Sequence, residues 1–440
     1  WLLAVLAAGL SAQDIPKAWD PHAVAGRLTM ERPSPKFISA DDYYKIPERV
    51  IYKTYPVYRP DKEPQNYIPF LSSQNPEIVF NPDAIKSEFE WLQAGEAVFN
   101  SAADATSLTP DDLRNPEVWK RFHLQVDEEG ALPGWRYVIR KRAKIELAPT
   151  LCGSCHEGVA NGVTYAGVPG KWRASALYAT DLRRRLNSIR DREAAERREL
   201  DRQFGLFSVP WQSPEPAAWM AQLAIGELWS AYDAVRVGTA VRPGASLLFP
   251  PIIPDLIGVQ ERTLLGATGW FRHESLADLI RFAVLESGFD EGAPPPAERL
   301  SDAQAYALAL FLYSLKAPKN PNRLDKFAKK GQAIFEREGC ASCHPGPRYT
   351  TGKAIPPDGD DPRLTVRTRR GTGLFRIPSL RNIWYREPLE HNGMLTTIED
   401  WFDPVRFRDD YSPRPVKGHA FGMKLSYEER QALAAYLRTL

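Results

Sequence analysis

The sequence predicts a mainly α-helical protein in which two related domains follow one another, with long irregular insertions and an N-terminal arm. Three observations lead to this prediction: a cysteine motif that occurs twice, flanking segments that repeat around each copy, and a helical pattern that closes each copy. The 440 residues are enough for two or three domains, and a hydrophobic share of 43% is ordinary for folded cores.

The first part of the chain differs in composition from the rest. Residues 1–12 form an apolar run that ends in small residues and resembles the remnant of a signal peptide. The alternative is a short membrane anchor, but the run is too short to cross a membrane, and no other stretch is apolar enough. We therefore expect a processed signal peptide, a periplasmic or secreted location and no stable membrane span. Residues 13–85 are rich in Pro and Tyr without clear periodicity, which predicts an extended arm laid over the body.

Related segments precede and follow each cysteine motif. Gly95-Glu-Ala-Val-Phe99 precedes the first motif, and Gly331-Gln-Ala-Ile-Phe335 precedes the second. Nine-residue segments that begin at Pro254 and Pro378, and end in Arg, follow the two motifs. Self-similarity of this kind is typical of a duplicated domain.

A helix is expected to close each copy, because Leu-Ser precedes an apolar stripe of helical spacing in both. Ser301 and Ser426 are the natural N-caps of these helices. We therefore expect an N-terminal domain over residues 86–316, a linker over residues 317–323 and a C-terminal domain over residues 324–440. Long insertions after Phe99 and after Tyr165 enlarge the first domain.

All four cysteines belong to two copies of Cys-x-x-Cys-His, namely Cys152-Gly-Ser-Cys155-His156 and Cys340-Ala-Ser-Cys343-His344. Two thiols at this spacing add to the two vinyl groups of one haem, and the adjacent His ligates the iron. A structural zinc site usually pairs two Cys-x-x-Cys units without a His after each, and a thioredoxin-type motif needs neither His nor a second copy. The motifs therefore predict two covalently bound haem c groups.

The iron's other axial ligand decides what each haem can do. In the second domain His419 precedes the closing helix and is the favoured ligand, with Met423, Met394 and His391 as weaker rivals and a surface histidine as the alternative. The matching segment of the first domain, residues 292–300, holds no His and no Met. An open iron there could bind hydrogen peroxide or dioxygen, unless His123 or His273 fills the position.

The segment from Leu265 to Leu276 holds the candidate catalytic residues, because it matches the loop that begins at Leu389 in the second copy. Trp270 could sit between the two haems as a stepping stone for electrons. His273 and Glu274 could supply a proton to bound peroxide. The alternatives are that Trp270 is plain core and that His273 is a hydrogen-bonded loop residue.

Charge gives little indication of a macromolecular partner. The 57 basic residues nearly balance the 55 acidic ones, which argues against nucleic-acid binding. Residues 181–204 interleave Arg with Asp and Glu around sparse apolar positions. This pattern is typical of a solvated helix, and a docking face for an acidic redox partner is the less favoured interpretation.

Three short motifs of the second copy resemble those of the bacterial di-haem cytochrome c peroxidases and MauG-like enzymes. They are Phe375-Arg-Ile-Pro-Ser-Leu-Arg-Asn382, Glu390-His391-Asn-Gly393 and Thr397-Ile-Glu-Asp400. The resemblance covers about residues 85–440 and implies two cytochrome c-type domains, a catalytic N-terminal haem, an electron-transfer C-terminal haem and a Trp between them. It also implies that Arg381 and His391 belong to the cofactor-binding residues.

The same resemblance implies a small redox donor, either a cytochrome c or a cupredoxin, and a possible calcium ion whose ligands no motif assigns. The chain departs from the peroxidases because Val405 stands where they carry a Met ligand, and the family's distal Glu has only Glu286 and Asp290 as candidates. His419 and the large insertions resemble the rubber oxygenase branch instead. We therefore expect a peroxidase-like oxidoreductase, with a dioxygen-dependent oxygenase and a non-catalytic di-haem electron carrier as alternatives.

Overall fold

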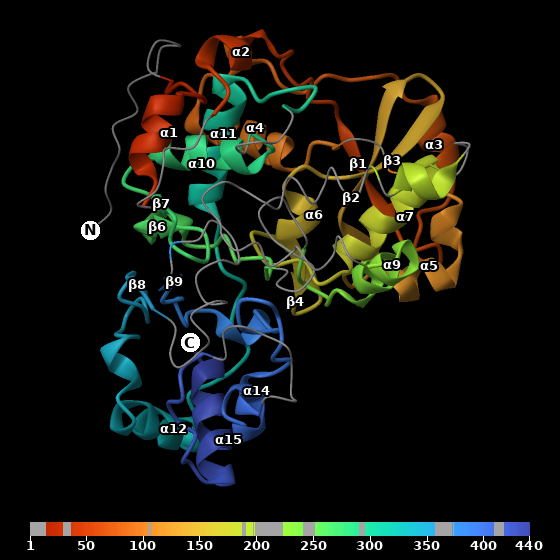
Figure 1. Ribbon diagram of the computed structural model, residues 1–440. Coiled ribbons are helices and arrows are strands. Elements are labelled where there is room, and N and C mark those ends of the chain that lie inside the picture. The colour runs from red at the N-terminus through yellow and green to blue at the C-terminus, as the bar shows by residue number, and fades with distance from the viewer. Residues whose placement is uncertain are drawn as a thin grey trace.

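The computed structural model describes most of the chain between residue 15 and the C-terminus. It covers residues 15–29, 37–103, 106, 108–186, 191–196, 198, 223–240, 251–289, 295–356, 372, 374–408 and 418–440. The expected signal-peptide remnant at residues 1–12 and much of the charged segment at residues 181–204 lie outside these ranges. The chain is largely helical and forms a large upper body and a smaller lower body, the latter built from the C-terminal part (Figure 1).

The described helices are α1 (Pro21–Arg27), α2 (Ala40–Lys45), α3 (Tyr67–Ser73), α4 (Glu88–Phe99), α5 (Pro116–Phe122), α6 (Gly153–His156), α7 (Ala174–Leu186), α9 (Ile225–Ala234), α10 (Leu276–Glu286), α11 (Asp302–Ser314), α12 (Lys326–Arg337), α14 (Ile398–Trp401) and α15 (Tyr427–Arg438). The strands are β1 (Thr54–Tyr58), β2 (Ala131–Lys141), β3 (Lys144–Pro149), β4 (Glu157–Ala160), β5 (Val163–Ala166), β6 (Leu264–Leu265), β7 (Phe271–Arg272), β8 (Ala354–Ile355) and β9 (Phe375–Arg376). None of the described helices is long and apolar enough to span a membrane.

One pair of crossing helices occurs in each body. Helix α4 packs on α11 in the upper body, and α12 packs on α15 in the lower body. A Gly allows the close approach in both: a Cβ on Gly95 would lie 2.1 Å from the carbonyl oxygen of Ala307, and a Cβ on Gly331 would lie 1.9 Å from that of Ala432. The repeated glycine therefore has a packing reason, because only a residue without a side chain lets the two helix backbones touch.

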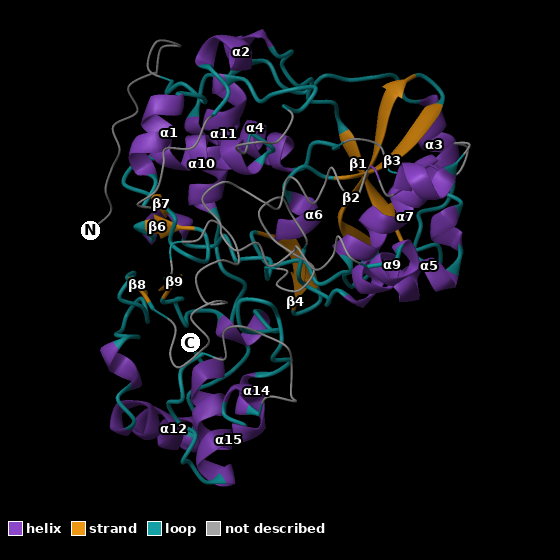
Figure 2. Ribbon diagram, viewed as in Figure 1, coloured by secondary structure: helices purple, strands orange, loops and turns teal. Residues whose placement is uncertain are grey.

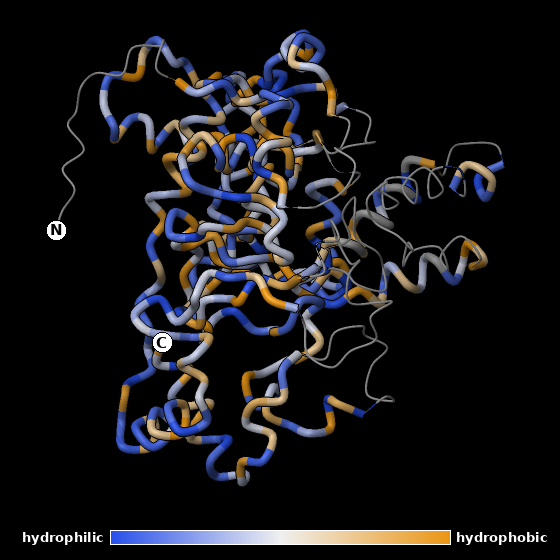
Figure 3. The backbone as a smooth tube through the Cα atoms, turned by 60° about the vertical axis from the view of Figure 1, so that its left-hand side comes forward, coloured by the Kyte–Doolittle hydropathy of each residue, from blue (hydrophilic) through white to orange (hydrophobic). Residues whose placement is uncertain are grey.

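Further details of the two helix pairs also coincide. The rings of Phe99 and Phe311 lie 5.4 Å apart, and those of Phe335 and Tyr436, at the matching positions, also lie 5.4 Å apart. The closing helices α11 and α15 begin in capping boxes at Ser301 and Ser426, which confirms both predicted N-caps. Hydrophobic and hydrophilic stretches alternate along the chain in both bodies, as amphipathic elements require (Figure 3).

The insertion after Phe99 is not irregular, contrary to the expectation from the sequence. It contains α5 and the hairpin β2–β3, and β1 of the N-terminal arm adds to the hairpin as a third antiparallel strand (Figure 2). Alternate residues of β2, including Trp135, Tyr137 and Ile139, are buried in one cluster with Leu147 of β3. Val138, between Tyr137 and Ile139, is buried in a separate cluster, so both faces of this strand are covered.

The N-terminal arm is anchored to the upper body by aromatic side chains. Trp19 and Tyr43 are completely buried, and their rings stack 5.5 Å apart. Phe289, which follows α10, packs on both rings. Residues 315–325, which join α11 to α12 and include the predicted linker, contain no helix or strand.

Candidate haem sites

The second cysteine motif follows α12 directly and lies on a single 3-10 turn, η6 (Cys340–Ser342). Both thiols are half-buried, and burial raises the pKa of Cys340 to about 11. Nδ1 of His344 lies 3.0 Å from the carbonyl oxygen of Tyr349 and donates its proton there, so Nε2 keeps its lone pair. Burial lowers the pKa of His344, so the ring stays neutral, as a metal ligand must.

His419 lies near enough to His344 for the charges of the two rings to interact. Burial, followed by the nearby charges of His344 and Arg406, lowers the pKa of His419 to about 4. The His419 ring lies against Trp401, at 5.2 Å, and Phe421, at 5.4 Å. Within the described part of the chain, its buried Nδ1 has no hydrogen-bond partner. Two thiols, a proximal imidazole and a second neutral imidazole form a donor set that fits a covalently bound haem c.

Arg406 holds the segment that carries His419, and the sequence analysis did not single it out. Its side chain is 1% exposed, and its guanidinium lies over the rings of Trp401, at 4.7 Å, and Phe407, at 4.1 Å. It donates hydrogen bonds to the carbonyl oxygens of Trp401, at 2.7 Å, and His419. Arg406 and Trp401 become neighbours of His419 only in the fold, so no local motif points to them.

The first cysteine motif lies at α6, with Cys152 as its N-cap and Cys155 within it. Nδ1 of His156 lies 3.0 Å from the carbonyl oxygen of Pro254, so a backbone carbonyl orients this ring as well. Pro254 begins the repeated segment of the first copy. Pro378 begins that of the second copy and lies beside His344, where its backbone opposes the larger effect of burial, which lowers the pKa of the ring. Each motif histidine therefore lies beside the proline that begins the repeated segment of its own copy.

The first motif also has supports of its own. The indole of Trp172 donates a 2.5 Å hydrogen bond to the Ser154 carbonyl, and buried Glu157 pairs with Arg136 at 2.8 Å. These contacts join α6 to β2 and to the residues before α7. The inserted sheet therefore forms one wall around the motif.

His123 and His273 are the two histidines that the sequence offers as a ligand opposite His156. His123 ends α5 at the surface and contacts Gln125, with their nitrogens 3.0 Å apart. His273 is buried, with Nδ1 2.6 Å from the Arg262 carbonyl and Nε2 2.7 Å from the Tyr313 hydroxyl. Both its nitrogens are engaged, so His273 matches the hydrogen-bonded alternative. Met30, Met220 and the candidate Asp290 lie outside the described residues.

The other candidate catalytic residues take different positions around the loop between β6 and β7. Trp270 is 2% exposed and packs on Phe282 with ring centroids 5.3 Å apart. Glu274 is 64% exposed and forms a 2.5 Å ion pair with Arg27. The structure therefore brings Trp270 and His273 into the interior and leaves Glu274 at the surface.

The loop that ends at Trp270 touches the lower body. The backbone N–H of Arg376 donates to the Ala267 carbonyl at 2.9 Å, and the Thr372 hydroxyl donates to the Thr268 carbonyl, also at 2.9 Å. The matching loop of the second copy makes the reciprocal contact, in which the N–H of Ile252 donates to the His391 carbonyl at 2.9 Å. The two loops therefore join the bodies in a nearly symmetric way.

The expected cofactor residues of the second copy lie at this same boundary. Arg381 pairs with Glu261 of the first copy at 2.8 Å. The ring of His391 lies 5.4 Å from that of Phe375, and the rival ligand Met394 is buried beside it in the same loop. Among the described residues, no group of three or more His, Cys, Asp or Glu side chains could hold a metal ion.

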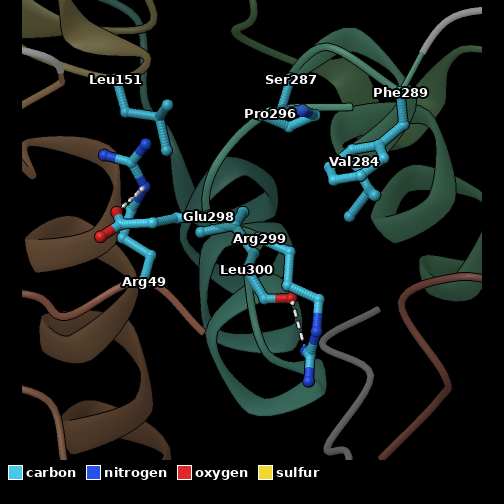
Figure 4. A pocket seen from close by; sticks show the side chains of 9 residues that line it. All are labelled: Arg49, Leu151, Val284, Ser287, Phe289, Pro296, Glu298, Arg299 and Leu300. Carbon is cyan, nitrogen blue, oxygen red and sulfur yellow. Dashed lines mark hydrogen bonds and ion pairs between the residues drawn. The ribbon is translucent and has the colours of Figure 1, made fainter. Parts of the chain in front are cut away.

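A small cavity lies where the first copy has the counterpart of the His419 segment (Figure 4). Its volume is about 30 Å³, and it is lined by Leu151, next to the first motif, and by Glu298 and Leu300, before α11. Arg49 reaches across one side toward Glu298, with Nε 3.8 Å from a carboxylate oxygen. A volume of this size holds about one water molecule.

Comparison with known proteins identifies a family match in the C-terminal part of the chain. Residues 328–440 match the cytochrome c family. The chain is 29% identical over 153 residues to cytochrome-c peroxidase IdrP2 of Pseudomonas sp. (strain SCT), a match that covers 27% of this chain and 40% of that protein. It is 28% identical over 159 residues to IdrP1 of the same strain, covering 27% and 41%. The chain thus spans less than half the length of these curated relatives.

Two solved structures show weaker likeness. Hydrazine synthase of Kuenenia stuttgartiensis has 18% identity and a TM-score of 0.34, over 54% of this chain and 86% of that chain. A MauG-like protein associated with microbial copper homeostasis has 17% identity and a TM-score of 0.27, over 37% and 58%. Both TM-scores are too low to support an inference. The chain therefore contains a C-terminal cytochrome c domain, with distant homology to cytochrome-c peroxidases, and its motif at Cys340 and Cys343 implies covalent haem c.

Proposed function

We propose that the chain is an extracytoplasmic di-haem c-type cytochrome with peroxidase-like activity. One haem is held at Cys152, Cys155 and His156, and it reacts with hydrogen peroxide. The other is held at Cys340 and Cys343, between His344 and His419, and it transfers electrons. A small cytochrome c or cupredoxin supplies these electrons. Haem, when bound, supplies the redox chemistry, and the protein supplies its ligands, their orientation and the path between the two sites.

One observation carries the proposal that there are two haems. Each Cys-x-x-Cys-His motif follows a glycine-containing helix that packs on the closing helix of its half, and each motif His meets the proline of the repeated segment. Neither feature follows from the cysteine spacing alone. The shared scaffold supports a second cytochrome c-type domain over residues 86–316, beside the domain over residues 324–440.

The proposed division of roles rests on what stands opposite each motif His. His419 shares the second site with His344, whereas His123 and His273 are both engaged elsewhere. Trp270 is the proposed relay, because it ends the loop that reaches the lower body through Ala267 and Thr268. A buried aromatic side chain at the boundary suits electron transfer between two sites in one chain.

The experiment that tests the proposal is a titration of the isolated holoprotein with hydrogen peroxide, followed by absorption spectroscopy and compared with a His419→Gly variant. We expect two haems by mass, a high-spin signal from one of them, and cyanide or peroxide binding at that haem alone. In His419→Gly the second haem should bind such ligands too. If both haems are low-spin and do not react with peroxide in any redox state, the protein is an electron carrier and not an enzyme. A stable ferrous–oxy spectrum would favour an oxygenase over a peroxidase.

A further inference from the structure

Two arginines at equivalent places each bridge two backbone carbonyls of one turn. Nη2 of Arg262 donates to the carbonyl oxygens of Asp255, at 2.6 Å, and Ile257, at 3.1 Å. Nη1 of Arg386 donates to those of Ser379, at 2.5 Å, and Arg381, at 3.2 Å. The arginines end the two repeated segments, so the same contact is made twice in the chain.

Each bridged turn begins with the proline that faces a motif histidine. Pro254 precedes Asp255, and its carbonyl lies 3.0 Å from Nδ1 of His156. Pro378 precedes Ser379 and lies beside His344, where its backbone and that of Tyr349 oppose the larger effect of burial, which lowers the pKa of the ring. Nδ1 of His344 itself lies 3.0 Å from the Tyr349 carbonyl. A backbone turn without side-chain support could shift this carbonyl, and with it the plane of the imidazole ring.

The two turns also share a backbone conformation. Each passes through a left-handed residue, Gly258 with φ of 71° and Asn382 with φ of 62°, into a short 3-10 helix, η5 (Val259–Glu261) or η7 (Ile383–Tyr385). Gly258 adopts this conformation without steric cost, whereas at Asn382 it costs free energy that the surrounding contacts must offset. The guanidinium groups supply those contacts from within the same segment.

We propose that Arg262 and Arg386 are positioning residues, each of which fixes the turn whose proline carbonyl orients the proximal histidine of its own half. Groups that hydrogen-bond to a metal ligand set its tautomer, its orientation and its basicity. The arginines act one step further out, on the backbone that carries the accepting carbonyl. The inference deepens the proposed function and rests on it, because it assigns one arginine to each of two haems.

A different explanation is that the two arginines act only by their positive charge. A substitution of Arg376 distinguishes this explanation from the proposal. Arg376 lies near both arginines: burial, then Arg262 and Arg386, lowers its pKa to about 9. Its Nε donates a hydrogen bond to the Gly266 carbonyl at 3.5 Å, and Gly266 belongs to neither turn. Removing Arg376 therefore removes a similar positive charge from the same place without releasing a turn.

The test uses Arg262→Gln, Arg386→Gln and Arg376→Gln variants of the full haem-loaded chain, measured by low-temperature electron paramagnetic resonance of the ferric protein and by redox titration. The signal lost in a Cys340→Ala/Cys343→Ala variant identifies the C-terminal haem. We expect Arg262→Gln to displace only the N-terminal haem's signal and Arg386→Gln only the C-terminal one. Arg376→Gln should leave both signals in place and lower the midpoint potentials, because a lost positive charge favours ferric iron.

Equal changes at both haems, no displacement in either variant, or the same displacement in Arg376→Gln would overturn the proposal. If a glutamine variant does not fold, the lysine variant is measured instead. It keeps the charge on a flexible stem, and a displaced signal of its own haem is again expected. An unmoved signal in that folded variant would also overturn it. A wild-type protein with fewer than two haem signals would contradict the proposed function instead.

Discussion

The close crossing of α12 and α15 allows a quantitative prediction for Gly331→Ala. The new Cβ would lie 1.9 Å from the carbonyl oxygen of Ala432 and 2.8 Å from Cβ of Tyr436. An ordinary contact begins at 3.4 Å, so the helices must separate by about 1.5 Å. Overpacking of this kind costs about 1–3 kcal/mol, and the better helix propensity of Ala returns about 1 kcal/mol. Because the obstacle is backbone that cannot rotate away, we expect a net loss of about 2 kcal/mol.

The assay is urea unfolding of the full chain, followed by haem absorbance and far-ultraviolet circular dichroism. A loss of about 2 kcal/mol lowers the midpoint of the affected transition by about 1 M urea for an ordinary denaturant dependence. Gly226→Ala in α9 is the matched control, because a Cβ at Gly226 meets nothing within 4 Å. That variant should be neutral or slightly stabilised. The packing argument is wrong if Gly331→Ala unfolds at the wild-type midpoint, or if both variants lose the same stability.

The remaining predictions concern the cysteines, the His419 segment and an ion pair of the insertion. Cys343→Ser should leave its haem with at most one thioether bond, so release of that haem under denaturing extraction is expected; full retention would argue against attachment there. Arg406→Gln should free the His419 carbonyl and produce a partly high-spin C-terminal haem in absorption spectra, whereas a spectrum like that of the wild type would mean that Trp401 and Phe421 position His419 alone. Hydrogen bonding to Arg184 is the main cause that lowers the pKa of Asp112 to about 2. The folded-state pKa is thus depressed, so this carboxylate stabilises the fold above about pH 4, and the contribution fades as the pH falls toward 2. Asp112→Asn should therefore be less stable than wild type at pH 7 and show a smaller loss of stability on acidification, and parallel acid-unfolding curves would contradict this.

The features that could be predicted from the sequence are those fixed by local chemistry. The spacing of Cys340, Cys343 and His344 is dictated by one haem, so it needs no knowledge of the fold. The N-caps Ser301 and Ser426 are visible because a capping box involves residues only three apart. The repeated placement of Gly95 and Gly331, each four residues before a Phe, was also visible, although its reason, a helix crossing, was not.

The features that were missed depend on contacts between distant segments. The alternation of Trp135, Tyr137 and Ile139 is typical of a strand, but its partner β1 lies in the arm, far away in sequence. The contacts of Arg406 with Trp401 and His419 likewise arise only when the chain folds back. For His273, the sequence could not decide between a proton donor and a structural residue, because the choice depends on Tyr313, 40 residues away.

The two halves share even single hydrogen bonds, so the proposed difference in their function must come from the segments that they do not share. The helix crossing, the proline that faces the motif His and the bridging arginine occur in both halves, so none of them can distinguish a reacting haem from a relaying one. The segment before the closing helix differs: the second half places His419 there, whereas the described part of the first half has Glu298 and Leu300 beside a cavity the size of a water molecule. In the proposed di-haem protein, the repeated segments would fix the motif-histidine side of each site, and the segments that differ between the copies would set the opposite side. The chemistry of each iron should therefore change with substitutions in these segments, and its proximal geometry with substitutions in the repeated ones.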